Sequence, residues 1–348
     1  MPSFRLPKSA HIWLPGYLKG LIRPNREPAT DLWLMVGDHY EPLCGSAGEE
    51  VGIERVQRWR REWPRIAERH TDSDGRPPRY TFFFPEEEYR PQFIDPLAEM
   101  TRDGIADVEV HLHHDRDTEQ NFIDRLSRFK ETLRCRHGLL HDFEGQTGFA
   151  FIHGNWALDN SLPGGRWCGL NNELVLLRRL GCYADFTLPS APSPAQTRTV
   201  NSIYWATDDP DKPKSHDTGI PLRPGQLRSG DLLMVQGPLG VRIGADGRLR
   251  PRLEMGEIAS YDRPSADRVR LWLRIAPRIG SHVFVKLFAH GTQEKNSQAL
   301  LGGDLDVLFR AVRSVSEEHG LRFHLVSAWE MFQAIEALRE RREPVVGE

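Results

Sequence analysis

The stretch VEVHLHHDRDTEQN, residues 108–121, reads as a β-strand that runs into a helix, and the fold can be worked out from this pattern. Successive side chains of a strand face opposite ways, so Glu109, His111 and His113 share one face and His114 lies on the other. Two imidazoles on one face, followed by a third imidazole and an acid, favour a metal or acid–base site as strongly as a hydrogen-bonded core histidine.

The same order of a β-rich apolar run and a helical pattern recurs along the chain. Strands are predicted at 31–38, 79–85, 107–114, 148–154, 182–189, 231–237, 282–290 and 322–327. Helices are predicted at 52–69, 118–134, 172–180, 266–275, 301–318 and 328–339. Seven or eight such βα units indicate parallel strands joined by helical crossovers, so the sequence predicts an α/β barrel.

Two regions interrupt this rhythm. Residues 191–228 are rich in Pro, Ser, Thr and Asp but contain SIYWA, which predicts a long ordered loop insertion. Residues 238–258 alternate around Asp246-Gly247, a common hairpin-turn dipeptide, and predict an added β-hairpin. The expected organisation is an extension at 1–30 packed on the barrel, a single barrel domain at 31–340 and a tail at 341–348.

Composition excludes some partners. The 348-residue chain has 46 Lys and Arg against 49 Asp and Glu, so it lacks the basic excess that steers proteins onto nucleic acid. Its four cysteines lack Cys-x-x-Cys spacing and are expected to be free thiols. No apolar run is long enough for a signal-peptide core or a transmembrane segment, so a soluble cytoplasmic protein is expected.

Polar residues gather where the predicted strands end. In a barrel of parallel strands the active site forms at the C-terminal ends of the strands. Acids or imidazoles occupy that position in five strands: Asp38-His39, His111 to His114, His153, Asp185 and His290. Such a mixed set suits a divalent metal, with zinc preferred over cobalt, nickel or manganese, and hydrolytic chemistry.

The order of these motifs resembles that of the polysaccharide deacetylase family, whose NodB-homology domain is a distorted (β/α)7 barrel. MVGDHYEP, EVHLHHDRD, FIHGNW, YADFTLPS and KLFAHG stand where that family has its five motifs. The resemblance spans roughly residues 31–327. It implies a fold of that type, with the hairpin and loop insertions added.

The resemblance also implies roles for single residues. Asp38 stands at the place of the catalytic base and His39 at that of a metal-binding aspartate. His113 matches the first histidine of the second motif, and His290 matches the histidine that assists the leaving group. The family's second metal histidine is replaced by Asp117.

Several residues compete for the remaining metal position. Asp117, His111 and His114 are all possible ligands, and Asp38 itself is another. Asp117 has an equally weighted structural interpretation as a helix N-cap, because DTEQ resembles a capping box. The predicted metal set is therefore His39, His111, His113 and Asp117.

Other residues are expected to contact the substrate. His153 replaces an arginine of the family, and His114 lies beside the metal motif. Asn155 and Trp156 suit the hydroxyls and faces of sugar rings. Asp185 stands at a family motif, where it would orient a catalytic group or bind substrate. The alternative is that it satisfies the local backbone.

The function expected from this reading is a metal-dependent hydrolase, a deacetylase acting on an N-acetylated sugar, glycan or glycan precursor. Two alternatives stay open. A metal-dependent hydrolase of a glycosidic or phosphoester bond can use the same arrangement. A non-catalytic carbohydrate-binding relative is the other.

Overall fold

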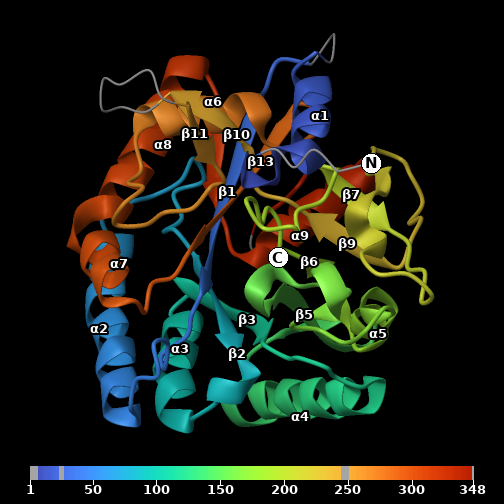
Figure 1. The fold of residues 1–348 in the computed structure, drawn as a ribbon. Coiled ribbons are helices and arrows are strands. Elements are labelled where there is room, and N and C mark those ends of the chain that lie inside the picture. Colours follow the sequence, from blue (N-terminus) through green and yellow to red (C-terminus); the bar gives the residue numbers. More distant parts are fainter. Residues whose placement is uncertain (1–6, 23–26, 244–250, 347–348) are drawn as a thin grey trace.

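A mostly parallel sheet forms the centre of the computed structural model, which describes residues 7–22, 27–243 and 251–346 (Figure 1). Seven parallel strands are hydrogen-bonded in the order β13-β1-β2-β3-β5-β6-β9. They are β1 (Asp31–His39), β2 (Tyr80–Pro85), β3 (Ala106–Leu112), β5 (Gln146–His153), β6 (Cys182–Asp185), β9 (Leu232–Val235) and β13 (His282–Ala289).

Shorter strands complete the sheet. The parallel strand β14 (Arg322–Leu325) pairs with the first half of β1, beside the half that pairs with β2. The antiparallel additions are β12 (Arg278–Ile279) on β13, β4 (His141–Phe143) on β5, and β7 (Ile203–Ala206) with β8 (Ile220–Pro221) beside β9. A separate hairpin pairs β10 (Gly240–Ile243) with β11 (Pro251–Glu254).

Helices follow most of the strands. They are α1 (Ala10–Leu21), α2 (Glu49–Ala67), α3 (Pro91–Arg102), α4 (Glu119–His137), α5 (Glu173–Arg179), α6 (Ala266–Ile275), α7 (Glu294–Ala299), α8 (Leu305–His319) and α9 (Ala328–Arg339). Short 3-10 turns include η1 (Pro7–Ser9), η2 (Glu86–Glu88), η3 (Gly154–Trp156), η4 (Pro163–Gly165) and η5 (Ser215–Asp217), and a π-helical turn η6 (Leu300–Asp304) precedes α8. No helix within the described ranges has the length and apolar composition needed to cross a membrane.

The sheet divides the interior into two cores. The outer core places residues such as Leu34 of β1 and Val110 of β3 against the helix side chains Trp59 and Phe122. The inner core contains the alternate residues of the same strands, and α9 closes it (Figure 1). The alternation of side chains along each strand therefore decides which core a residue enters.

The ladder of hydrogen bonds does not close into the predicted barrel. Within the described ranges no ladder joins β9 to β13. The chain after β9 instead runs against β13, where a Cβ on Gly237 would lie 2.4 Å from the Lys286 carbonyl oxygen. The segment after β11 then pairs with the end of β13, where Phe288 donates to the Gly256 carbonyl. The observed fold class is a mixed α/β structure with a mostly parallel sheet.

The predicted strands and helices recur in the structure with shifts of a few residues, and the sequence missed others. The strand β7 lies inside the region predicted as a loop insertion, and α3 was not predicted. The hairpin strands β10 and β11 flank the expected turn, whose dipeptide Asp246-Gly247 lies outside the described residues. The extension before β1 contains α1, which buries Trp13 and Tyr17 against Leu239 and Ile275.

Candidate metal centre at the strand ends

Seven side chains converge beyond the C-terminal ends of β1, β2, β3 and β13, and we call them the mouth cluster. Two of them, His39 and His111, face the inner core and are 4 % and 0 % exposed. The others form a partly exposed rim, with side chains between 18 % and 32 % exposed. The rim consists of Glu41, Glu87, His113, Glu257 and His290.

The tautomer of His111 is set by the backbone. Its Nδ1 donates to the Ile152 carbonyl oxygen over 2.7 Å, which leaves Nε2 to face the cluster. Nε2 of His111 lies 3.3 Å from Oε1 of Glu41, and Nε2 of His113 lies 3.6 Å from the same oxygen. On its other side, His113 pairs through Nδ1 with Glu87 at 2.5 Å. Both rings therefore present Nε2 to Glu41.

His39 connects the two halves of the cluster. Its ring centroid lies 5.0 Å from that of His111 and 4.8 Å from that of His290. Burial, together with the neighbouring His290 and His111, holds the pKa of His39 well below its usual value. A neutral imidazole is the form that binds metal.

The acids and histidines of the mouth cluster shift one another's pKa values. Burial opposes protonation of His290, yet Glu257 and Glu41 raise its pKa. Burial likewise works against the charge of Glu41, but the hydrogen bond from His111 and the charges of His111 and His113 lower its pKa. The environment of the mouth cluster therefore favours the neutral form of His39, the ionised form of Glu41 and the protonated form of His290.

Three members have ligand atoms close enough to share one cation. A nitrogen of His39, a nitrogen of His111 and an oxygen of Glu41 all lie within 4.8 Å of one another. Imidazole nitrogen and carboxylate oxygen are ligands that suit zinc and the related divalent metals. This donor set, which faces a partly exposed rim, fits a metal site with a free position.

Asp38 lies on the opposite face of β1 from His39 and is fully buried in the outer core region. Tyr80 donates to its Oδ2 over 2.7 Å, and the Gly291 backbone N–H donates to its Oδ1 over 2.8 Å. Burial raises the pKa of Asp38 to about 6, although both hydrogen bonds act in the other direction. Its carboxylate thus holds the turn that follows β13, and its charge also acts on His290 at the mouth.

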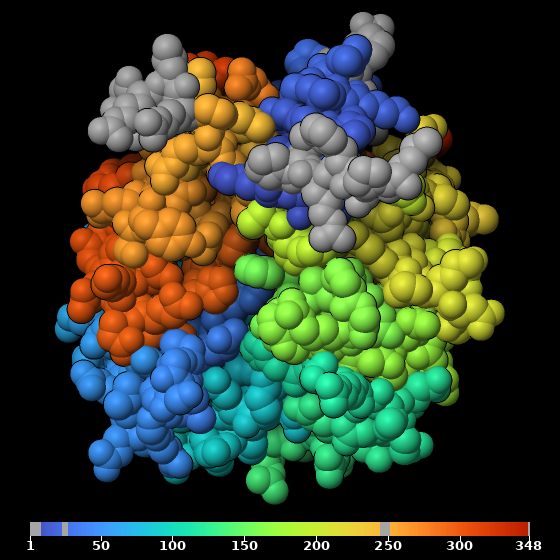
Figure 2. Space-filling view, viewed as in Figure 1, coloured from blue at the N-terminus to red at the C-terminus, as the bar shows by residue number. Residues whose placement is uncertain are grey.

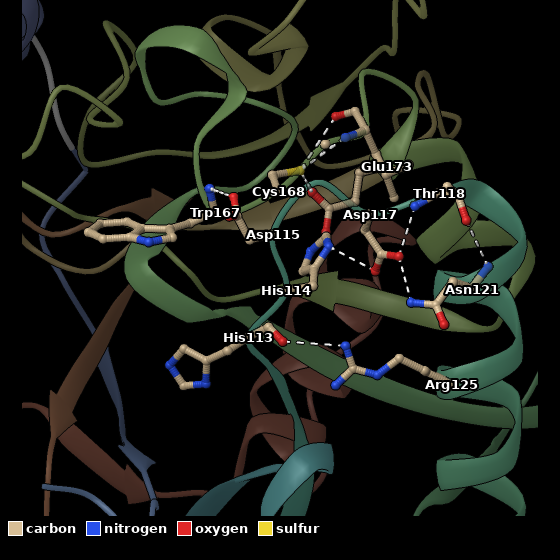
Figure 3. A network of polar contacts seen from close by, with 12 residues as sticks. His113, His114, Asp115, Asp117, Thr118, Asn121, Arg125, Trp167, Cys168 and Glu173 are labelled. Atoms are coloured by element: carbon tan, nitrogen blue, oxygen red, sulfur yellow. Dashed lines mark hydrogen bonds and ion pairs between the residues drawn. The ribbon is translucent and has the colours of Figure 1, made fainter. Parts of the chain in front are cut away.

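Three of the predicted residues, His114, Asp117 and His153, lie in a second group, and Figure 3 shows the first two of them. His114 Nε2 is 3.2 Å from Glu173 Oε1, and His114 Nδ1 is 3.2 Å from Asp117 Oδ2. His153 Nε2 lies 3.5 Å from the same Glu173 oxygen. We call His114, Asp117, His153, Cys168 and Glu173 the buried cluster. The alternation along β3 separates His114 from His113, so the predicted metal set is divided between two places.

Asp117 is therefore not a ligand of the mouth cluster. Its Oδ1 accepts from the Thr118 N–H and from Asn121 Nδ2, while its Oδ2 faces His114. The helix N-cap is Thr118, one residue later than the alternative interpretation placed it, and its hydroxyl accepts from the Asn121 N–H.

The expected substrate residues are spread over different environments. Asp185 is 1 % exposed and accepts from the Thr187 N–H and hydroxyl, so its carboxylate supports the turn after β6. Asn155 is exposed and Trp156 half-buried in η3, next to the mouth. A Cβ on Gly154 would lie 2.4 Å from the His113 ring, which explains why a glycine stands there. In Figure 2 the molecular face is hollowed between the light-green surface of this region and the orange surface near residues 260–300.

The sequence missed the acids of the rim. Glu41 follows His39 by two residues, and Glu87 and Glu257 lie in loops after β2 and β11. Glu41 carries a usable signal, because it belongs to the same strand-end motif as His39. Glu257 has none, because only the packing of the hairpin segment against β13 brings it to His290.

Comparisons with known proteins do not assign the chain to a family. No family model matches it, and no curated protein is similar to it in sequence. Among solved structures, a 4-alpha-glucanotransferase from Thermococcus litoralis superposes with a TM-score of 0.43 at 12 % identity. The superposition covers 88 % of this chain and 43 % of the glucanotransferase, so the chain spans less than half the length of that enzyme.

Proposed function

We propose that this protein is a metal-dependent hydrolase whose active site is the mouth cluster. The observation that carries the proposal is the convergence of His39, Glu41 and His111 within 4.8 Å, beneath a rim of partly exposed acids and imidazoles. Catalytic metal sites keep one side open to water and substrate, whereas structural sites enclose the ion in protein ligands.

We further propose that the bond cleaved is the amide of an N-acylated sugar. This assignment is supported by the order of the strand-end motifs, which resembles that of the polysaccharide deacetylase family. Asn155 and Trp156, which flank the mouth on η3, supply an exposed amide and an aromatic face for a sugar ring.

His39, Glu41 and His111 are the residues that would hold the metal. A divalent cation bound there would supply Lewis-acid chemistry, polarising a carbonyl group and lowering the pKa of water. Zinc is the metal that this mixed donor set suits best.

The proton-transfer roles fall to the rim. His290 holds a proton because Glu257 and Glu41 raise its pKa, so it is suited to protonate a departing amine. His113 is held in place by Glu87 and is the second group able to hold a proton. Asp38, the base implied by the motif order, is better suited to position the turn that carries His290, since both its oxygens accept hydrogen bonds.

A screen for acetate release tests this proposal. The purified protein, loaded with zinc, cobalt, nickel or manganese in turn, is incubated with N-acetylated and O-acetylated sugars, and free acetate is measured. We expect release that is lost in His39→Ala and kept in His319→Ala, a control at an exposed histidine on α8. If sugars bind to both variants as to the parent protein and no acetate forms with any metal, the protein is a carbohydrate-binding protein instead.

A further inference from the structure

We propose that the buried cluster is a second metal site, a structural zinc centre with His114, His153, Cys168 and Glu173 as its four ligands. One nitrogen of each histidine, the cysteine sulfur and a carboxylate oxygen all lie within 4.8 Å of one another, and all four residues are buried. The side chains of both histidines and of Glu173 are at most 1 % exposed. Four protein ligands with no open side are the arrangement of a structural zinc site.

The ring of His153 is already oriented to bind a metal ion through Nε2. Nδ1 of His153 donates to the Gly154 carbonyl over 2.5 Å, which leaves the lone pair of a neutral ring on Nε2. That nitrogen is fully buried and has no hydrogen-bond partner, yet it lies 3.5 Å from Glu173 Oε1. In the interior, a lone pair that faces a carboxylate oxygen is repulsive unless a proton or a metal ion lies between them.

His114 differs from His153 because its Nε2 is hydrogen-bonded to the same carboxylate. Its Nε2 lies 3.2 Å from Glu173 Oε1, while Nδ1 on the far side of the ring faces Asp117 Oδ2 at 3.2 Å (Figure 3). A carboxylate behind a histidine fixes the ring and makes its other nitrogen a better ligand. Asp117 would thus orient His114 and would not bind the metal.

Cys168 lies as a thiol that donates to Glu173 Oε2, and burial and this carboxylate raise its pKa, so a bound metal ion would have to replace its proton. Its sulfur accepts from the backbone N–H groups of Asn160 and Leu170 at 3.3 and 3.4 Å, and it lies 3.3 Å from Glu173 Oε2. Backbone N–H groups stabilise negative charge on sulfur. With a zinc ion, one thiolate and one carboxylate, the four-ligand site would be electrically neutral.

Another group of acids and a histidine in this chain serves as an internal comparison. At the opposite end of the sheet, both ring nitrogens of His324 are paired, Nε2 with Asp31 at 2.9 Å and Nδ1 with Asp74 at 2.8 Å. Those side chains satisfy one another without an ion. The buried cluster differs because it leaves the His153 nitrogen unpaired and aimed at the point where the other ligands converge.

Zinc content and zinc K-edge absorption test the proposal. The experiment uses the full chain carrying His39→Ala and His111→Ala, so that zinc at the mouth does not contribute. We expect about one zinc per chain with one sulfur neighbour at about 2.3 Å and the rest nitrogen or oxygen. Absence of zinc after growth with added zinc, or zinc without a sulfur neighbour, would overturn the proposal.

Cysteine variants supply a second measurement. Protein produced with cobalt should show thiolate-to-cobalt charge-transfer absorption that Cys168→Ser abolishes and Cys182→Ser keeps, since Cys182 is equally buried but belongs to no such group. Persistence of this absorption in Cys168→Ser would also overturn the proposal. Acetate release is measured separately, so a failure here is distinct from a failure of the proposed hydrolase.

Discussion

The mouth cluster and the buried cluster both consist of histidines and acids, with one cysteine added in the buried cluster, but they differ in their access to water. His113 at the mouth is 31 % exposed, whereas the side chain of its sequence neighbour His114 is 1 % exposed. The mouth has more groups than a metal needs and leaves one side open. The buried cluster has four ligands and no opening. Exposure is therefore a better criterion than residue composition for telling a candidate catalytic site from a candidate structural site.

The largest expected effects distinguish the two clusters. A variant of the buried cluster should lose stability, and a variant of the mouth cluster should lose activity. His153→Ala should lower the free energy of unfolding by about 3–5 kcal/mol, because it removes a fully buried ligand and leaves Glu173 beside a cavity. His290→Ala, at a rim side chain that is 20 % exposed, should lower turnover by at least about 100-fold with a smaller loss of stability. Denaturant unfolding and the acetate assay measure the two effects.

His319→Ala serves as the control for both measurements, because this histidine is exposed. If His290→Ala destabilises the chain as much as His153→Ala does, the contrast between an open and a closed site is wrong.

A chelator should remove metal from the two clusters at different rates. At the mouth the rim admits water, so we expect that metal to leave first, together with activity. Metal in the buried cluster should leave only as the chain opens, with a fall in the melting temperature. A chromogenic chelator follows release while activity is sampled in parallel, and a single phase of release would contradict the difference in access.

The pH dependence of activity in a Glu257 variant tests the proposed role of His290 as a proton donor. Glu257 raises the pKa of His290, and a proton donor loses activity as pH rises through its pKa. In Glu257→Gln that alkaline limb should move to lower pH, by about one unit. Glu144→Gln, a change at an exposed acid remote from both clusters, should leave the profile of kcat against pH unchanged.

The smallest expected effect concerns Asp38. Its pKa is raised by burial to about 6, so between about pH 4 and 6 the folded chain binds a proton that the unfolded chain has released. The stability that this group contributes is present below pH 4 and is lost as pH rises to 6, by at most about 3 kcal/mol. In Asp38→Asn the free energy of unfolding should therefore fall less steeply over this range.

Denaturant unfolding at several pH values measures this slope, and Asp142→Asn at an exposed position is the control. The same Asp38→Asn protein tests the two roles of this residue. A positioning role predicts a loss of turnover smaller than about 100-fold, whereas loss of a general base predicts about 10²- to 10⁴-fold.

Much of the sheet could be predicted from the sequence, because strands with continuous apolar runs stand out. Alternation along β3 also predicted that His111 and His113 share a face and that His114 leaves it, and the structure confirms this arrangement. The helix α3 was missed because Pro91 and Pro96 obscure its pattern. Whether the hydrogen-bonded ladder closes between β9 and β13 depends on the long-range path of the chain, which no local pattern encodes, and within the described residues it does not close.

The sites were predictable only where they lie in strand-end motifs. His39, His111 and His290 are such residues, and they meet at the mouth. Cys168 and Glu173 come from a long loop and the start of α5, and no spacing relates them to His114. Their convergence depends on how that loop folds back over β3, where the Asp117 N–H donates to the Cys168 carbonyl.

The close approach of Gly154 to the His113 ring joins the two clusters physically. His113 and His114 are adjacent, and so are His153 and Gly154, so two short backbone segments each have one residue facing the mouth and one facing the buried cluster. A ligand that orders the buried cluster would also order the Gly154 backbone that the His113 ring contacts. If an ion in the buried cluster changes the affinity of the mouth for substrate, thermodynamic linkage requires that bound substrate change the affinity for the ion by the same factor.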